Sequence, residues 1–214
     1  MRAREQKKKR AQKLLKKLKQ LFPNPKITLR YGNTWELLVA VMLSAQCTDK
    51  KVNEVTAKLF RKYKKLDDYA RASSNRRTKE EFEQDVRSTG FYRNKTKNIL
   101  KSAKIIQERY GGHVPDTMDE ILKLPGVARK TANVVLGNAY GVVEGIAVDT
   151  HVARLSQRFG LTKETSPEKI EQDLMEIMPK DEWFKFTYRL IEYGRKYCSA
   201  KRCPPSHPLR VFDI

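Results

Sequence analysis

The chain is poor in cysteine and lacks any long apolar run. Its 214 residues include three cysteines, Cys47, Cys198 and Cys203, too few for the disulfide framework of a small secreted protein. No segment approaches the roughly 18 consecutive apolar residues that a membrane-spanning helix needs. The first residues, MRAREQKKKR, contain no apolar core of a secretory signal. These absences predict a soluble protein that works in the cytoplasm.

Acidic residues are also scarce relative to basic ones. The chain holds 45 Lys and Arg against 25 Asp and Glu, which gives a formal net charge of +20. Heat-stable proteins carry many charges of both signs, and that would explain the abundance of charge but not its imbalance. An excess of this size indicates a polyanionic partner, most often nucleic acid.

The first 20 residues concentrate this charge, with ten basic side chains and one acid, Glu5. They could form an arm that grips DNA. They could also be the solvated face of a helix, because apolar residues recur among them at helical spacing. The basic residues are Arg2, Arg4, Lys7, Lys8, Lys9, Arg10, Lys13, Lys16, Lys17 and Lys19, and the apolar ones are Leu14, Leu15, Leu18, Leu21 and Phe22.

The sequence shows no alternating pattern of a sheet, no internal repeat and no low-complexity linker. Helical periodicity predicts an all-α protein instead. The expected helices are one ending before Pro23, one following Asp49 as its N-cap, and those near 34–46, 66–72, 79–87, 93–110, 118–122, 129–140, 150–159, 167–178 and 181–197. Ile146, Ala147 and Val148 form the one short β-like run.

A proline–glycine turn stands out at Leu124, where the sequence reads LPGVARKTANVVLGNAY. Two short helices joined by Pro125–Ala128 would form a helix–hairpin–helix. The backbone N–H groups of Gly126 and Ala128, at a helix N-terminus, can bind a phosphate without reading sequence. The alternative is an ordinary corner between two helices.

Two ionisable residues near this turn could carry chemistry. Lys130 lies in the first turn of the helix and could act as an amine nucleophile if its pKa is lowered. Asp149 begins the next helix, in the segment IAVDTHVAR, where it could handle protons or simply cap the helix. Together with the phosphate-binding turn, they suggest chemistry on a nucleic-acid backbone.

These motifs resemble the endonuclease III family of DNA glycosylases in the helix–hairpin–helix superfamily. LPGVARKTANVVL followed by VDTHV carries the resemblance, and LSAQCTD at 43–49, STGFYRNK at 88–95 and YGRKYC at 193–198 match in order. The resemblance implies two helical domains with a DNA cleft between them. Residues 28–143 would form a six-helix barrel with the hairpin, and residues 1–27 plus 144–214 the second domain.

The resemblance also implies a reaction, that of a bifunctional glycosylase and apurinic/apyrimidinic (AP) lyase acting on oxidised pyrimidines. A damaged nucleotide is flipped out of the duplex. Lys130, as a neutral amine, attacks C1′, expels the base and leaves a Schiff base, and β-elimination cuts the strand. The helix N-terminus and neighbouring Arg129 would lower the lysine pKa from its usual value of about 10.4. Asp149 would assist deprotonation or stabilise the cationic sugar.

Further residues match DNA contacts of the family. Gln46 would fill the gap left by the flipped nucleotide or read the opposite base, and Phe91 would insert into the kinked duplex as a wedge. Their alternatives are polarity at a helix end and core packing. Ser44 matches the same loop as Gln46, and His151 is expected to support the site or face DNA.

The main departure lies at the C-terminus. Many family members bind a [4Fe–4S] cluster there through C-x6-C-x2-C-x5-C, whereas this chain has Cys198, Cys203 and then Ser206. Two thiolates cannot supply the four ligands of the cluster. A zinc site from Cys198, Cys203 and His207 would lack one ligand. We therefore expect a variant without cofactor or metal, its tail held by packing and by Pro204, Pro205 and Pro208.

Two neighbouring activities do not match. Thymine-mismatch glycosylases of the superfamily typically carry Tyr at the position of Lys130, and adenine glycosylases usually lack that lysine and place a Glu in the 44–49 loop. A preference for uracil, a mismatch or a purine lesion stays open, as does a non-catalytic DNA-binding module. The expected partner is damaged or abasic double-stranded DNA, bound by a monomer associated with the nucleoid.

Overall fold

The computed structural model describes residues 2–214, with side chains from residue 4 on, and this part of the chain is helical without strands. It divides into two compact units. One unit is Thr28–Val142, and the other joins the residues up to Ile27 with Val143–Ile214. None of the helices described is long and apolar enough to cross a membrane.

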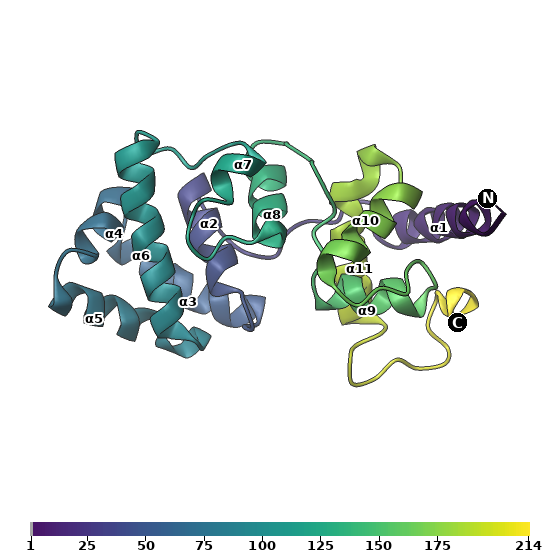
Figure 1. Cartoon of the computed structure of the whole chain (residues 1–214). Helices are drawn as coiled ribbons and strands as arrows, with labels where there is room; N and C mark the ends of the chain where they lie inside the picture. The colour runs from purple at the N-terminus through teal and green to yellow at the C-terminus, as the bar shows by residue number, and fades with distance from the viewer. Residues whose placement is uncertain (1) are drawn as a thin grey trace. The chain divides into compact units, whose positions relative to one another are not determined.

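The unit of Thr28–Val142 is built around α2, whose residues from Leu37 to Leu43 are all buried. Helix α2 packs against α8, α3 and α6, and α6 packs against α4 and α5 (Figure 1). Trp35, Tyr63, Tyr69 and Phe82 form an aromatic cluster beside it. The helices are α2 Thr34–Leu43, α3 Asp49–Lys62, α4 Leu66–Ala72, α5 Arg76–Val86, η1 Arg87–Thr89, α6 Tyr92–Arg109, α7 Met118–Ile121 and α8 Arg129–Ala139.

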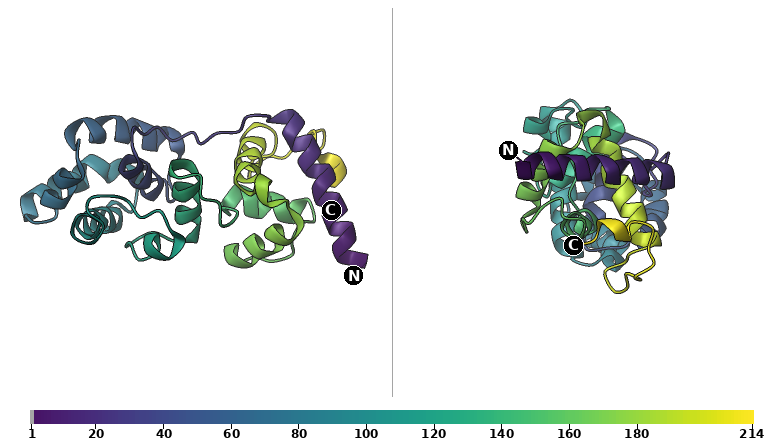
Figure 2. Two further views of the ribbon diagram at one scale, coloured as in Figure 1. Left: turned by 90° about the horizontal axis from the view of Figure 1, so that it is seen from above. Right: turned by 90° about the vertical axis from the view of Figure 1, so that its right-hand side faces the viewer.

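The other unit contains α1 Arg2–Leu21, α9 Thr150–Arg158, α10 Pro167–Ile177, η2 Lys180–Glu182, α11 Trp183–Lys196 and η3 Arg210–Phe212. Helix α1 packs against α10 and α11 (Figure 2). It buries Leu14, Leu15 and Leu18 against this core, so the amphipathic reading of the first 20 residues is confirmed. Most of its basic side chains are exposed. The side chain of Arg2 lies outside the described part.

Three sequence predictions need correction. Helix α2 ends at Leu43 rather than Gln46, because the backbone of Gln46 turns into the left-handed region. The N-cap of α3 is Thr48, whose side chain accepts from the Lys51 N–H, so Asp49 is the first helical residue. The segment 146–148 is buried but forms no strand, since the described part offers it no partner strand.

The C-terminal tail is held by a disulfide between Cys198 and Cys203. The sequence alone predicts two free thiolates at these positions, and the disulfide corrects that prediction. The zinc alternative loses its ligands, because both sulfurs are bonded to each other and both ring nitrogens of His207 have partners. The phenol oxygen of Tyr193 lies 2.5 Å from Nδ1, and Oδ2 of Asp213 lies 3.0 Å from Nε2.

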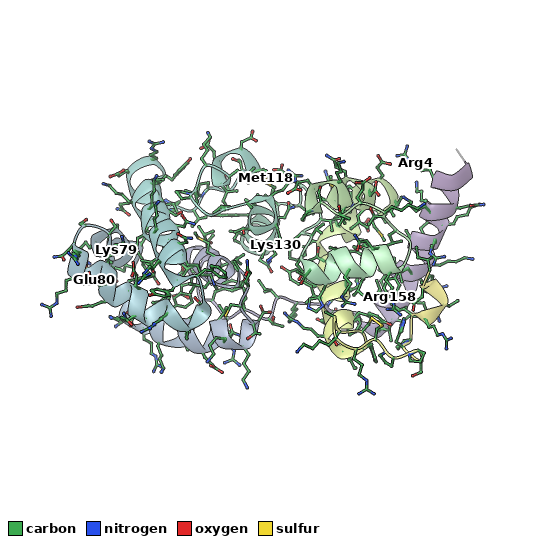
Figure 3. The ribbon with its side chains drawn as sticks, turned by 60° about the horizontal axis from the view of Figure 1, so that its bottom comes forward. Arg4, Lys79, Glu80, Met118, Lys130 and Arg158 are labelled. Carbon is green, nitrogen blue, oxygen red and sulfur yellow. A yellow bond between two sulfur atoms is a disulfide. The ribbon has the colours of Figure 1, made fainter. Side chains whose placement is uncertain are left out.

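Asp213 connects this hydrogen-bond network to helix α9. Nε and Nη2 of Arg158, a residue labelled in Figure 3, donate to the two carboxylate oxygens of Asp213 at 3.0 and 2.6 Å. Burial opposes ionisation of Asp213, but the hydrogen bonds from Arg158 and His207 outweigh it and hold its pKa below the ordinary value. Charged and neutral groups, together with the Cys198–Cys203 disulfide, thus hold the tail in place.

Replacement of Asp213 by Asn is expected to lower the free energy of unfolding at pH 7 by about 1–2 kcal/mol. Because the folded-state pKa is depressed, the stabilisation is complete above the unfolded value near 3.9 and is lost as the pH falls through the folded value. Thermal melts of wild type and D213N should therefore differ at pH 7 and converge as the pH falls through the depressed pKa of Asp213. Glu176→Gln, which removes an exposed ion pair with Arg4, is the control and should leave stability unchanged. A constant difference at all pH values would contradict this linkage.

Candidate functional site

The hairpin turn joins α7 to α8 and presents its backbone outward. Leu124 and Val127 are buried, and the Val127 N–H donates to the Leu124 carbonyl at 3.1 Å. Gly126 and Ala128 flank Val127 and are exposed. The apolar residues therefore anchor the turn while the two small residues form its outer surface.

Helix α6 packs against the turn through two of its side chains. The Ser102 hydroxyl donates to the Pro125 carbonyl at 3.1 Å. Gly126 has a φ of +78°, and a Cβ atom there would lie 2.6 Å from Nδ2 of Asn98. Glycine is thus required twice, by the left-handed backbone and by the contact with Asn98.

Replacement of Gly126 by Ala is expected to destabilise the protein by about 1–3 kcal/mol and to weaken binding to abasic duplex DNA about tenfold. The added methyl must displace Asn98 and shift the amides of the turn. Gly141→Ala is the matched control, because Gly141 has a φ of +69° but nothing within 4 Å of an added Cβ. Melting curves and fluorescence anisotropy would measure the two effects. Equal DNA affinity for both variants would contradict a phosphate-binding role for the turn.

Lys130 is the second residue of α8 and is half-buried (Figure 3). Ala128, the N-cap, offers no side-chain cap to the first N–H groups of this helix. The first turn of a helix carries unsatisfied N–H groups and a positive potential. An anion such as a phosphate is therefore favoured beside Lys130 and Arg129.

Asp149 is oriented by the segment before it and by the helix after it. Ile146, Ala147 and Val148 are buried, and the Thr187 hydroxyl on α11 donates to the Ala147 carbonyl at 3.0 Å. Oδ1 of Asp149 accepts from the Val152 N–H at 2.8 Å, so the predicted N-cap is confirmed. One carboxylate oxygen serves the cap, and the side chain is held in one orientation.

His151 follows on α9 and packs against α11. A Cβ atom at Gly194 would lie 2.3 Å from its Nδ1, so the helices meet at a position that only glycine allows. The YGRK match in the sequence therefore has a packing reason. His151 is half-buried, which suits the support role expected of it.

Gln46 and Phe91 are the two non-glycine residues with positive φ in the described chain, at 53° and 48°. Both are exposed, Phe91 with 64% of its surface. Core packing of Phe91 and a role for Gln46 at the end of α2 are thus both wrong. A left-handed backbone at such residues costs about 1 kcal/mol or more and is typical of functional sites.

The predicted residues fall into two groups. Gly126, Ala128, Arg129 and Lys130 belong to the same unit as Ser44, Gln46 and Phe91, whereas Asp149 and His151 belong to the other unit. Lys95 was missed, although it ends the STGFYRNK match. Only 7% of Lys95 is exposed. The sequence does not predict this burial, because a lysine in a helix is usually exposed.

Comparison with known proteins identifies the family of the chain. The sequence profile "HhH-GPD superfamily base excision DNA repair protein" matches residues 39–180. Endonuclease III of Synechocystis sp. is 50% identical over 196 residues, which cover 92% of this chain and 87% of the relative. The chain belongs to the endonuclease III family. Endonuclease III of Bacillus subtilis is also 50% identical, over 88% of this chain and 85% of that protein.

Family membership extends to the fold and the activity class. A trapped endonuclease III–DNA covalent intermediate superimposes with a TM-score of 0.90 and 45% sequence identity, covering 96% of this chain and 95% of that one. The helix–hairpin–helix glycosylase fold predicted from the sequence is confirmed. As a member of the endonuclease III family, the chain is a DNA glycosylase and AP lyase with DNA as its partner.

Proposed function

We propose that Lys130 is the nucleophile and Asp149 the assisting carboxylate in the removal of oxidised pyrimidines from duplex DNA. The observation that carries this proposal is a half-buried lysine in the first turn of a helix that follows an exposed glycine turn. A phosphate bound at the turn would place a nucleotide next to the amine. Asp149 has a defined orientation because it caps α9.

The reaction proceeds in two stages. The neutral Lys130 amine attacks C1′ of the flipped nucleotide while the glycosidic bond breaks and its electron pair leaves with the base. Asp149 offsets the positive charge that develops on the sugar and accepts a proton from the amine. The lysine nitrogen then forms a double bond to C1′ as the C1′–O4′ bond breaks and O4′ takes up a proton, which opens the sugar ring. The Schiff base so formed acidifies the C2′ proton, and loss of this proton expels the 3′ phosphate by β-elimination. Water then hydrolyses the Schiff base and frees the lysine.

Gly126 and Ala128 would hold the DNA backbone, with Arg129 adding charge. Gln46 would occupy the space of the flipped nucleotide and Phe91 would wedge the neighbouring stack. The exposure of both side chains on left-handed backbone supports these roles. Ser44 would contact DNA in the same loop as Gln46, and His151 would have a supporting role or face DNA. The net charge of +20 favours work on chromosomal DNA in the nucleoid.

Borohydride trapping tests the proposed function. Wild-type protein is incubated with duplexes that contain thymine glycol, dihydrouracil, uracil or an abasic site, and sodium borohydride reduces any Schiff base to a stable adduct. We expect adducts with the oxidised pyrimidines and the abasic site, and mass spectrometry of the cross-linked peptide should place the DNA on Lys130. Trapping with uracil but with neither oxidised pyrimidine would change the substrate, and absence of any adduct would overturn the lyase mechanism.

A further inference from the structure

Lys95 is a buried lysine in a protein whose other lysines mostly face solvent. It lies in the first turn of α6 and is 7% exposed. Its Nζ donates to the Leu43 carbonyl and to the Thr89 carbonyl, each at 2.8 Å. Burial lowers the pKa of its ammonium, and the electrostatic interaction with Cys47 offsets part of that shift. Both bonds require no more than N–H donors, so they persist in either protonation state.

The two carbonyls belong to the ends of two helices that precede two exposed loops. Leu43 is the last residue of α2, and Gln46 follows three residues later. Thr89 is the last residue of η1, and Phe91 follows two residues later. Carbonyls at a helix C-terminus lack partners within the helix and favour a cation. The Lys95 amine is thus hydrogen-bonded to the backbone at the start of both loops.

The same two loops carry the two left-handed non-glycine residues of the described chain. Such backbone persists only when the surroundings hold it in place. The loops are otherwise closed by short local bonds, from the Cys47 N–H to Ser44 and from the Gly90 N–H to Arg87. The side chain of Lys95 bonds to both segments at once, and a buried amine is costly unless it is hydrogen-bonded.

We propose that Lys95 is a positioning residue for lesion recognition, which sets the separation of the Gln46 and Phe91 loops so that both side chains enter the duplex together. This inference rests on the proposed roles of Gln46 and Phe91 in binding DNA. A methionine would fill nearly the same volume without a donor, so Lys95→Met removes the two hydrogen bonds to the loops and leaves little empty space.

A double-mutant cycle tests the inference. Single-turnover base release from a thymine glycol duplex is measured for wild type, Lys95→Met, the pair Gln46→Ala with Phe91→Ala, and all three changes together. We expect Lys95→Met to slow base release about tenfold in the wild-type background and less than about twofold in the loop-variant background, because residues that act as one unit are not additive. Lys62→Met, which removes a lysine that pairs with Asp85 on the surface, is the control and should leave the rate unchanged.

The outcomes separate the inference from the proposed function. An equal loss in both backgrounds, or no loss at all, overturns the role of Lys95 while wild-type activity stands. A loop variant as fast as wild type overturns it as well, since Lys95 would then have nothing to position. A wild type that releases no base contradicts the proposed function itself. Melting curves place each assay at a temperature where every variant is folded, and Lys95→Arg, which keeps the donors, should recover part of the rate.

Discussion

Alanine at position 130 is expected to abolish the borohydride adduct with abasic DNA and to slow strand cleavage by at least about 10³-fold. No other group would then form the Schiff base on which β-elimination depends. Alanine has the highest helix propensity, so α8 should stay intact. Single-turnover cleavage of an abasic duplex, followed on a denaturing gel, gives the rate, and gel-shift of the reduced complex gives the adduct.

Lys104→Ala is the matched control, because it removes the same charge from an exposed lysine of α6 that pairs with Glu108. DNA affinity should change equally in the two variants if Lys130 acts by chemistry rather than by holding the DNA. A K130A protein that binds weakly but still traps would show that a different amine is the nucleophile. A protein that neither binds nor traps would assign Lys130 to DNA binding.

Replacement of Asp149 by Asn is expected to reduce base release by about 10²–10⁴-fold without loss of stability. Asparagine caps a helix about as well as aspartate and can still accept from the Val152 N–H, but it carries no charge to stabilise the sugar or to take a proton. Lesion duplexes measure the glycosylase step. On DNA that is already abasic the defect should be smaller, since the base has left.

Asp149→Ala separates the two roles of this carboxylate. It should show the same catalytic loss and in addition lower the free energy of unfolding by about 1 kcal/mol, because the cap of α9 is gone. If the Asn variant keeps full activity while the Ala variant only unfolds more easily, Asp149 is a helix cap and the catalytic assignment is wrong.

The positions of the helices could be predicted from the sequence because capping residues and helical periodicity are local signals. Ser166 with Pro167 predicted the start of α10, and Asp149 predicted the start of α9, and both caps are present. The helix ends that precede the loops were harder to predict. The sequence predicts α2 up to Gln46 because nothing in that residue favours the left-handed backbone it adopts, whereas the helix ends at Leu43. The β-like segment at 146–148 was misread because burial alone selects apolar, branched residues.

The cysteines illustrate the same division. Their spacing excluded the four-cysteine cluster from the sequence alone, but the bond between Cys198 and Cys203 depends on how the tail folds back onto α9 and α11. From the sequence His207 is a possible metal ligand, because the residue type is known but the hydrogen-bond partners of its ring nitrogens are not. The structure gives those nitrogens to Tyr193 and Asp213.

The sequence by itself determined the all-α class, the basic surface, the hairpin and the two residues proposed for catalysis, because periodicity, charge and short motifs are properties of neighbours along the chain. Tertiary structure alone decided how Gly126 meets Asn98, how Asp213 secures the tail and how Lys95 joins the ends of α2 and η1. Each of these arrangements includes a contact between residues far apart in sequence. Their energies depend on burial and distance, which only the folded chain sets.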